Sequence, residues 1–149
     1  MGYERCYVCG AENPKGLHLH FEKYGEEGVT AEFNSEEWHG GWPGIQHGGI
    51  TCALLDEAAA YVANNLGLIT VTAKLDVEFQ NPIHSGETVR VVAFPVRKTR
   101  RLIEAEAQIT SLDGVPKARA HAKMMVLNHT QLQSMGLEGL TPVNLDPDR

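Results

Sequence analysis

The stretch QHGGITCALLDEAAAYVANNLG, residues 46–67, decides the fold of this 149-residue chain. Residues 50–66 are almost all apolar or small, and neither Pro nor Gly interrupts them. Asn64, Asn65 and Gly67 supply the chemistry that ends a helix. The pattern predicts one helix of roughly 17 residues, about 25 Å long at ~1.5 Å per residue. Because apolar residues occur on nearly every side of it, we expect this helix to be enclosed by protein.

Two acidic residues interrupt the apolar character of the predicted helix. Asp56 and Glu57 lie near its middle. An ionised carboxylate in apolar surroundings costs free energy unless it is hydrogen-bonded, paired or used in chemistry. These two residues are therefore the first candidates for a functional site.

Alternating apolar and polar residues predict six strands besides the helix. They cover residues 17–22, 29–33, 71–80, 88–98, 102–110 and 117–126. Short turns connect several of them, which favours antiparallel pairing with one face of the sheet exposed to water. A sheet of this size can cover its inner face by curling around one helix. The sequence therefore predicts an α+β fold, an antiparallel sheet of about six strands wrapped around one long central helix.

Length and charge narrow the class of protein. Residues 1–149 fit a single domain, with an N-terminal segment at 1–16 and a loosely held tail at 128–149 that is rich in Gly, Pro and Asp. The formal net charge of −6 argues against nucleic acid as a partner. The apolar helix is too short and too acidic at its centre to span a membrane. No export signal precedes the domain and the cysteines number three, so we expect a cytoplasmic protein without membrane partners.

The N-terminal segment contains a Cys-x-x-Cys pair, Cys6 and Cys9. One interpretation is half of a zinc site, completed by His18 and His20. The other is a turn whose small thiols pack against the domain. Since no second Cys-x-x-Cys exists, only half of a ligand set is evident, and we expect no metal here.

A family resemblance rests on several motifs. The central one is His47-Gly48-Gly49 with Asp56 nine residues after the histidine, preceded by Trp42-Pro43-Gly44. Further motifs are Cys6-x-x-Cys9-Gly10, Asn13-Pro14-x-Gly16-Leu17, Pro82, Gly86-Glu87 and the turn at Gly114. Over residues 6–127 the chain resembles the hotdog-fold acyl-CoA thioesterases. It is most similar to the phenylacetate-degradation-type branch of the 4-hydroxybenzoyl-CoA thioesterase superfamily.

The resemblance implies roles for the central motif. The Gly49 N–H would polarise the thioester carbonyl, and Asp56 would attack it or activate a water. The physical chemistry agrees, because a helix N-terminus offers unpaired N–H donors, and Gly48 and Gly49 let a substrate approach the backbone closely. Gly49 and Asp56 are two turns apart and share a helix side, whereas Glu57 is about 100° away and fits a structural pair better. For His47, a ring hydrogen bond that fixes the loop is the expected role, with substrate contact as the alternative.

Other candidate residues lie outside the helix. Aligned on Pro82, Thr72 stands where relatives carry a Ser or Thr that positions the lytic water, and it lies on the polar face of its predicted strand. Relatives often have Asn or Gln shortly before the motif histidine, where this chain has Gly40 and Gly41, so His39 is a candidate replacement in substrate binding. Contacts to the phosphates of coenzyme A would come from basic residues at one hairpin, Arg97, Lys98, Arg100 and Arg101.

The function that these residues indicate is hydrolysis of an acyl-CoA to a free acid and CoA, with no cofactor, because CoA is part of the substrate. Covalent attack and water attack both remain open. The alternative is a non-catalytic module that binds CoA esters or senses metal. Gly49 and Asp56 are about 10 Å apart along the helix, too far to serve one carbonyl. We therefore expect an obligate homodimer, or a tetramer of such dimers, with active sites shared between two chains.

Overall fold

The computed structural model describes residues 3–145, which form one antiparallel sheet, a long helix and a short one. The strands are β1 (Glu22–Tyr24), β2 (Gly28–Asn34), β3 (Thr70–Phe79), β4 (Thr88–Lys98), β5 (Leu102–Ser111) and β6 (Pro116–Val126). The helices are α1 (Gly48–Asn65) and α2 (His129–Ser134), with a 3₁₀ turn, η1 (Glu37–His39), before α1. None of these helices is long and apolar enough to cross a membrane.

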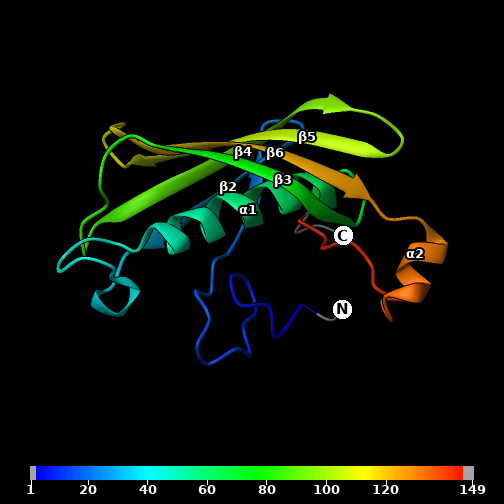
Figure 1. The fold of residues 1–149 in the computed structure, drawn as a ribbon, viewed down its shortest axis with the longest axis horizontal. Helices are drawn as coiled ribbons and strands as arrows, with labels where there is room; N and C mark the ends of the chain where they lie inside the picture. Colours follow the sequence, from blue (N-terminus) through cyan, green and yellow to red (C-terminus); the bar gives the residue numbers. More distant parts are fainter. Residues whose placement is uncertain (1–2, 146–149) are drawn as a thin grey trace.

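The sheet has the strand order β1-β2-β4-β5-β6-β3, and every neighbouring pair is antiparallel. It curves over α1, which lies against one of its faces (Figure 1). β3 follows α1 in the chain but pairs with β6, so it forms one edge of the sheet. This is the predicted hotdog fold, a single antiparallel sheet wrapped around one helix.

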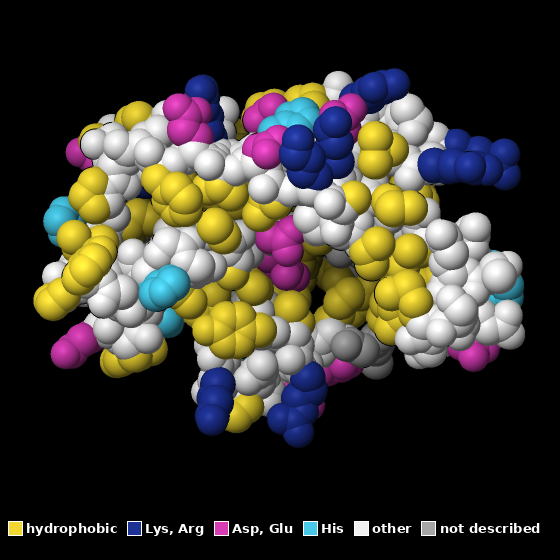
Figure 2. Space-filling model, in the orientation of Figure 1, with side chains coloured by type: hydrophobic (Ala, Val, Ile, Leu, Met, Phe, Trp, Pro, Cys, Tyr) yellow, Lys and Arg dark blue, Asp and Glu magenta, His cyan; other side chains and the backbone are white. Residues whose placement is uncertain are grey.

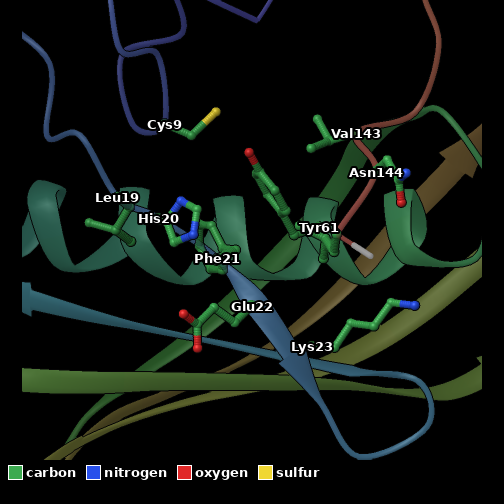
Figure 3. A pocket seen from close by; sticks show the side chains of 10 residues that line it. Cys9, Leu19, His20, Phe21, Glu22, Lys23, Tyr61, Val143 and Asn144 are labelled. Atoms are coloured by element: carbon green, nitrogen blue, oxygen red, sulfur yellow. The ribbon is translucent and has the colours of Figure 1, made fainter. Parts of the chain in front are cut away.

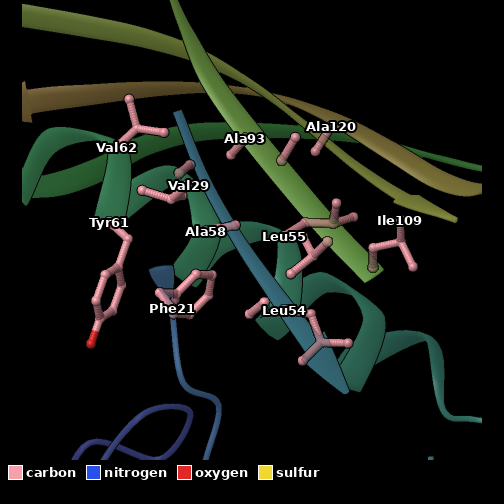
Figure 4. Close-up of a cluster of buried hydrophobic side chains, with 14 of the residues drawn as sticks. Phe21, Val29, Leu54, Leu55, Ala58, Tyr61, Val62, Ala93, Ile109 and Ala120 are labelled. Atoms are coloured by element: carbon pink, nitrogen blue, oxygen red, sulfur yellow. The ribbon is translucent and has the colours of Figure 1, made fainter. Parts of the chain in front are cut away.

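The core lies between α1 and the inner face of the sheet (Figure 4). Leu54, Leu55, Ala58 and Val62 of α1 are fully buried there. Alanines face them from three neighbouring strands, and none is more than 3% exposed: Ala93, Ala105, Ala107, Ala118, Ala120 and Ala122. Small side chains let the helix approach the sheet closely, as the alanine pattern of residues 118–122 predicts.

One side of α1 is only partly covered by the residues that the structure describes. Ala53, Asp56 and Ala60 are only partly buried, although the sequence predicted enclosure on all sides. The physical reason is that the sheet lies against one face of the helix, and the N-terminal segment lies against only part of the rest (Figure 1). The enclosure expected of an apolar helix is therefore incomplete within one chain.

The first predicted strand is the largest difference in secondary structure. Leu17, Leu19 and Phe21 are buried, as the alternation predicted. However, His18 has a left-handed φ of 54°, which interrupts an extended strand. The Leu17 and Leu19 amides donate to backbone oxygens of the N-terminal segment at 2.8 Å, and only residues 22–24 pair with β2.

The C-terminal segment is packed against α1 up to residue 145, where the sequence had predicted loose attachment. Asn128 caps α2, after which the chain returns toward α1 (Figure 1). The Val143 amide donates to Asn64 Oδ1 at 3.3 Å, and Val143 and Leu145 pack on the core. These contacts join the segment to α1 as far as residue 145. The last four residues of the predicted tail lie outside the described residues.

Candidate active site

His47 begins α1 as its N-cap residue. Its ring Nδ1 accepts a hydrogen bond from the Gly49 N–H at 2.8 Å, and its carbonyl accepts one from Ile50 at 3.0 Å. The ring hydrogen bond expected of His47 is therefore present, but it occupies the N–H that the sequence assigned to the substrate. Among the described residues, no group accepts a hydrogen bond from the Gly48 N–H. The free donor at this helix end is thus Gly48.

The space around Gly48 is open. Gly48 lines a hollow of about 320 Å³ with Phe79 and Gln46, and a second one of about 470 Å³ with Trp42 and His47. A Cβ built on Gly48 would lie 3.5 Å from the Phe79 ring, an ordinary contact. A small group can therefore reach the backbone at the start of α1.

Gln46 is a residue of this site that sequence reasoning missed. Its side chain is buried, and Nε2 donates to Thr51 Oγ1 at 2.9 Å. Its Oε1 is buried without a hydrogen-bond partner among the described residues. Since buried polar atoms are nearly always satisfied, this oxygen is a candidate acceptor for a water or substrate donor beside Gly48. The available signal was an amide residue directly before the motif histidine.

Asp56 lies on the partly covered side of α1, about two turns from the helix start. The Thr72 hydroxyl donates to Asp56 Oδ1 at 2.7 Å, so the two residues that the sequence proposed as partners are brought together. Figure 2 shows acidic side chains near the middle of this face of the molecule, with hydrophobic side chains around them. One turn earlier in α1, burial and the Asp56 charge raise the pKa of the Cys52 thiol.

A β-bulge explains why Thr72 reaches the helix. Thr72 pairs with Met124, but Lys74 pairs with the next residue of β6, Lys123, so Ala73 is an extra residue in β3. Cross-strand partners share a face, and Met124 is fully buried on the inner face. The predicted position of Thr72 on the polar face is therefore wrong, because the alternation that relates it to Leu75 changes phase at Ala73.

Glu57 is placed differently from Asp56, in contact with the N-terminal segment. The Cys6 thiol lies 3.6 Å from Glu57 Oε1. Burial raises the pKa of the Glu57 carboxyl, with the two thiols acting against the shift. Burial also raises the pKa of the Cys9 thiol to about 12. Glu57 therefore belongs to a separate cluster, as its angle on the helix predicted.

His39 supports the loop before α1. His39 is 9% exposed, and its ring lies tilted against Phe33 with the ring centroids 4.9 Å apart. Its Nδ1 accepts a hydrogen bond from the Glu36 N–H. Its carbonyl accepts the His47 N–H at 2.8 Å. Burial lowers the pKa of this imidazole. These contacts use the side chain within the loop and do not favour the predicted substrate contact.

The four basic residues predicted to bind CoA surround the β4–β5 hairpin. Arg97 pairs with Glu104 and Lys98 with Glu27, whereas Arg100 and Arg101 are exposed and form no ion pair with a described residue. Register places this hairpin at the Thr72 end of the sheet: Lys98 is opposite Ile103, Ile103 opposite Met124, and Met124 opposite Thr72. Three strand spacings of ~4.8 Å separate Lys98 from Thr72 by about 14 Å.

Comparison with known proteins decides the family. The family model of the thioesterase superfamily matches residues 43–118, which include α1, β3, Asp56 and Thr72. The chain belongs to the thioesterase superfamily. Among curated proteins, none matches its sequence.

Solved structures confirm the hotdog arrangement of this thioesterase-superfamily chain. The PaaI protein of the Escherichia coli phenylacetic acid degradation operon matches with a TM-score of 0.73 and 21% identity, over 79% of this chain and 88% of its own. A Streptococcus mutans protein bound to acetyl-CoA matches at 0.70 and 18%, over 74% and 89%. A hypothetical thioesterase from Streptococcus pneumoniae with coenzyme A matches at 0.70 and 21%, over 74% and 86%.

Proposed function

We propose that this protein hydrolyses an acyl-CoA thioester to a free acid and CoA, with Asp56 as the base or nucleophile. The observation that carries the proposal is the Asp56 carboxylate, held by the Thr72 hydroxyl at 2.7 Å on the partly covered side of α1. A hydrogen bond to one oxygen orients the carboxylate and leaves the other available. Because the chain belongs to the thioesterase superfamily, thioester hydrolysis is the reaction that this geometry would serve. In the S. pneumoniae relative, alanine variants were solved at one threonine and one aspartate that are 16 positions apart, as are Thr72 and Asp56 here.

The oxyanion donor in this proposal is the Gly48 N–H. It is free at the N-terminus of α1, where the helix dipole also favours negative charge. Gly49, the donor that the sequence indicated, could serve only after its N–H left the His47 ring. With His47 in place, the ring instead fixes the direction of the first helical turn.

Two routes satisfy this geometry. In the first, Asp56 accepts a proton from water while the water oxygen bonds to the thioester carbon. The tetrahedral oxyanion then collapses, the C–S bond breaks, and the CoA thiolate takes the proton back from Asp56. In the second, Asp56 itself bonds to the carbonyl carbon and expels the thiolate, and water hydrolyses the resulting anhydride. In both routes the developing oxyanion accepts a hydrogen bond from a backbone N–H.

The end of the sheet that carries Thr72 could bind the CoA portion of the substrate. The exposed guanidinium groups of Arg100 and Arg101 lie at the adjoining hairpin, and Arg97 and Lys98 precede them at the end of β4. An extended pantetheine arm bridges the separation of about 14 Å between this hairpin and Thr72. These cations would hold the phosphates by charge-assisted hydrogen bonds. Relatives solved with acetyl-CoA and with coenzyme A support this class of ligand.

The site needs two chains. Gly48 and Asp56 are eight residues apart, about 12 Å along α1, whereas attack requires roughly 3–3.5 Å between reacting atoms. Two antiparallel α1 helices would set each Gly48 against the other chain's Asp56. Two surfaces support such a homodimer. One is the partly covered side of α1, and the other is the edge of β3, which pairs with no further strand of the described residues and ends at an exposed Phe79. A long unpaired edge strand is a common pairing surface.

Release of free CoA thiol from a panel of short, long and aromatic acyl-CoAs tests the proposal. We expect the wild-type chain to hydrolyse at least one of them, and the Asp56→Asn chain to be far slower on the same substrate. If the two chains hydrolyse every member of the panel at equal rates, the proposal is wrong.

A further inference from the structure

Three potential metal ligands converge beside Glu57, about 100° around α1 from Asp56. Cys6, Cys9 and Glu57 each offer one ligand atom, and these atoms all lie within 4.8 Å of one another. Among the described residues this is the one such group of His, Cys, Asp or Glu. The proposed hydrolysis uses none of the three.

The distances suit a tetrahedral ion. Zinc binds thiolate sulfur at ~2.3 Å and carboxylate oxygen at ~2.1 Å, so two such ligands are about 3.6 Å apart at a tetrahedral angle. Cys6 Sγ and Glu57 Oε1 are 3.6 Å apart. The side chains therefore already have the separation that a shared zinc ion would impose.

The loop that presents the thiols is built around the first sulfur. The Cys9 N–H points at Cys6 Sγ at 3.5 Å, and the Gly10 N–H donates to the Cys6 carbonyl at 2.9 Å. A Cβ on Gly10 would lie 2.5 Å from backbone atoms of Cys6 and Glu4, so only glycine permits this turn. Amide donors directed at a sulfur stabilise its anionic, metal-binding form.

No cation pairs with Glu57 among residues 3–145. Its carboxylate is partly buried, its neighbours are the two thiols, and no Lys, Arg or His of the described chain pairs with it. A carboxylate in such surroundings is costly without a positive partner. A divalent ion would supply that charge, and each thiol would lose its proton to solvent on binding.

We propose that Cys6, Cys9 and Glu57 bind one zinc ion, which fastens the N-terminal segment to α1. Two thiolates select a borderline-soft ion over magnesium or calcium. Cys9 and Tyr61 also line a hollow of about 490 Å³, and the Tyr61 hydroxyl points toward the segment that carries Cys9 (Figure 3). Water in this hollow completes the fourth position.

The proposed site departs from the expectation of no metal, which rested on the incomplete ligand set evident in the sequence. The sequence offered His18 and His20 as the missing ligands, but neither belongs to the cluster. The His18 ring instead contacts the Asn13 carbonyl, and His20 lines the hollow. The third ligand comes from the helix, 48 residues beyond Cys9 in the chain.

Zinc content and cobalt binding of the full chain test the site independently of hydrolysis. We expect near-stoichiometric zinc in the purified wild type and in Cys52→Ser, a control that removes the thiol outside the cluster. The Cys6→Ser/Cys9→Ser double variant should hold none, and Glu57→Gln should bind zinc at least about tenfold more weakly in chelator competition. Removing the metal should lower the thermal midpoint of the wild type and leave that of the double variant unchanged.

A spectroscopic measurement on the wild type covers the case in which the serine variants fail to fold. Cobalt added to the reduced, metal-free chain should give intense thiolate-to-cobalt charge-transfer absorption, which zinc then displaces. The proposal is overturned if this absorption is absent, or if the wild type holds no more zinc than the double variant. Either result would leave the proposed hydrolysis untouched.

Discussion

Asp56 and Glu57 are consecutive residues of one helix, yet neighbouring elements give them opposite surroundings. Asp56 accepts a hydrogen bond from the hydroxyl of Thr72 on the edge strand β3. Glu57, about 100° further around the helix, meets the thiols of the N-terminal segment. The side chains are nearly the same chemically, so the difference lies in what the rest of the fold brings to each side of α1.

The two sides of α1 therefore suit different roles, the Asp56 side catalysis and the Glu57 side attachment of the N-terminal segment. Burial raises the pKa of the Glu57 carboxyl, and the thiols of the N-terminal segment lie against it. The Asp56 side of the helix is only partly covered and is open to a substrate or a second chain. The two carboxylates should therefore respond differently to the same substitution.

The largest expected effect is loss of turnover in Asp56→Asn. Removing a general base costs about 10²–10⁴-fold in rate, and kcat for the best acyl-CoA should fall by that order. Glu57→Gln is the matched control on the next position. It should keep most of the turnover and lower the thermal midpoint instead, because it disturbs the thiol cluster. The contrast between the residues fails if Glu57→Gln reduces kcat as much as Asp56→Asn.

The second-largest loss of turnover is expected at the start of α1, where Gly48 is substituted. Gly48→Pro removes the free N–H, and loss of one oxyanion donor should cost about 10²–10³-fold in kcat. Proline suits the first helical position, and His47, with φ −61° and ψ 134°, already has the backbone that precedes proline. Gly48→Ala adds a side chain but keeps the N–H, so it should retain activity. Equal losses in both variants would assign the effect to bulk near Phe79.

The smallest effect is expected at Thr72, which acts on Asp56 through one hydrogen bond. Thr72→Val keeps the shape and removes the hydroxyl. A hydrogen bond to a charged group contributes ~1.5 kcal/mol, so kcat should fall about tenfold. Thr72→Ser retains the donor and should recover most of the rate. A Val variant as active as the Ser variant would show that Asp56 needs no orientation from β3.

Periodic segments were predictable because one physical pattern dominates each of them. The helix was expected at residues 50–66 and spans Gly48–Asn65, and Gly67, at φ 79°, follows its end as predicted. The strand expected at residues 88–98 is β4, Thr88–Lys98. In these segments, burial and alternation agree along the whole length.

Local irregularities and long-range contacts were not predictable. The extra residue at Ala73 has no distinctive side chain, yet it moves Thr72 to the inner face. The contact between Glu57 and Cys6 joins residues 51 positions apart, and no periodicity encodes it. Use of the Gly49 N–H by His47 depends on a ring orientation that only the folded loop defines. Tertiary geometry decides all three features.

Mixing two inactive chains tests most directly whether each site combines Gly48 of one chain with Asp56 of another. Asp56→Asn and Gly48→Pro chains are unfolded together in equal amounts and refolded. Random pairing makes about half of the dimers mixed, and each mixed dimer has one intact and one doubly disabled site. If sites are shared in this way, about a quarter of wild-type turnover should be recovered. No recovery, with folded mixed dimers demonstrated, would show that each site belongs to a single chain.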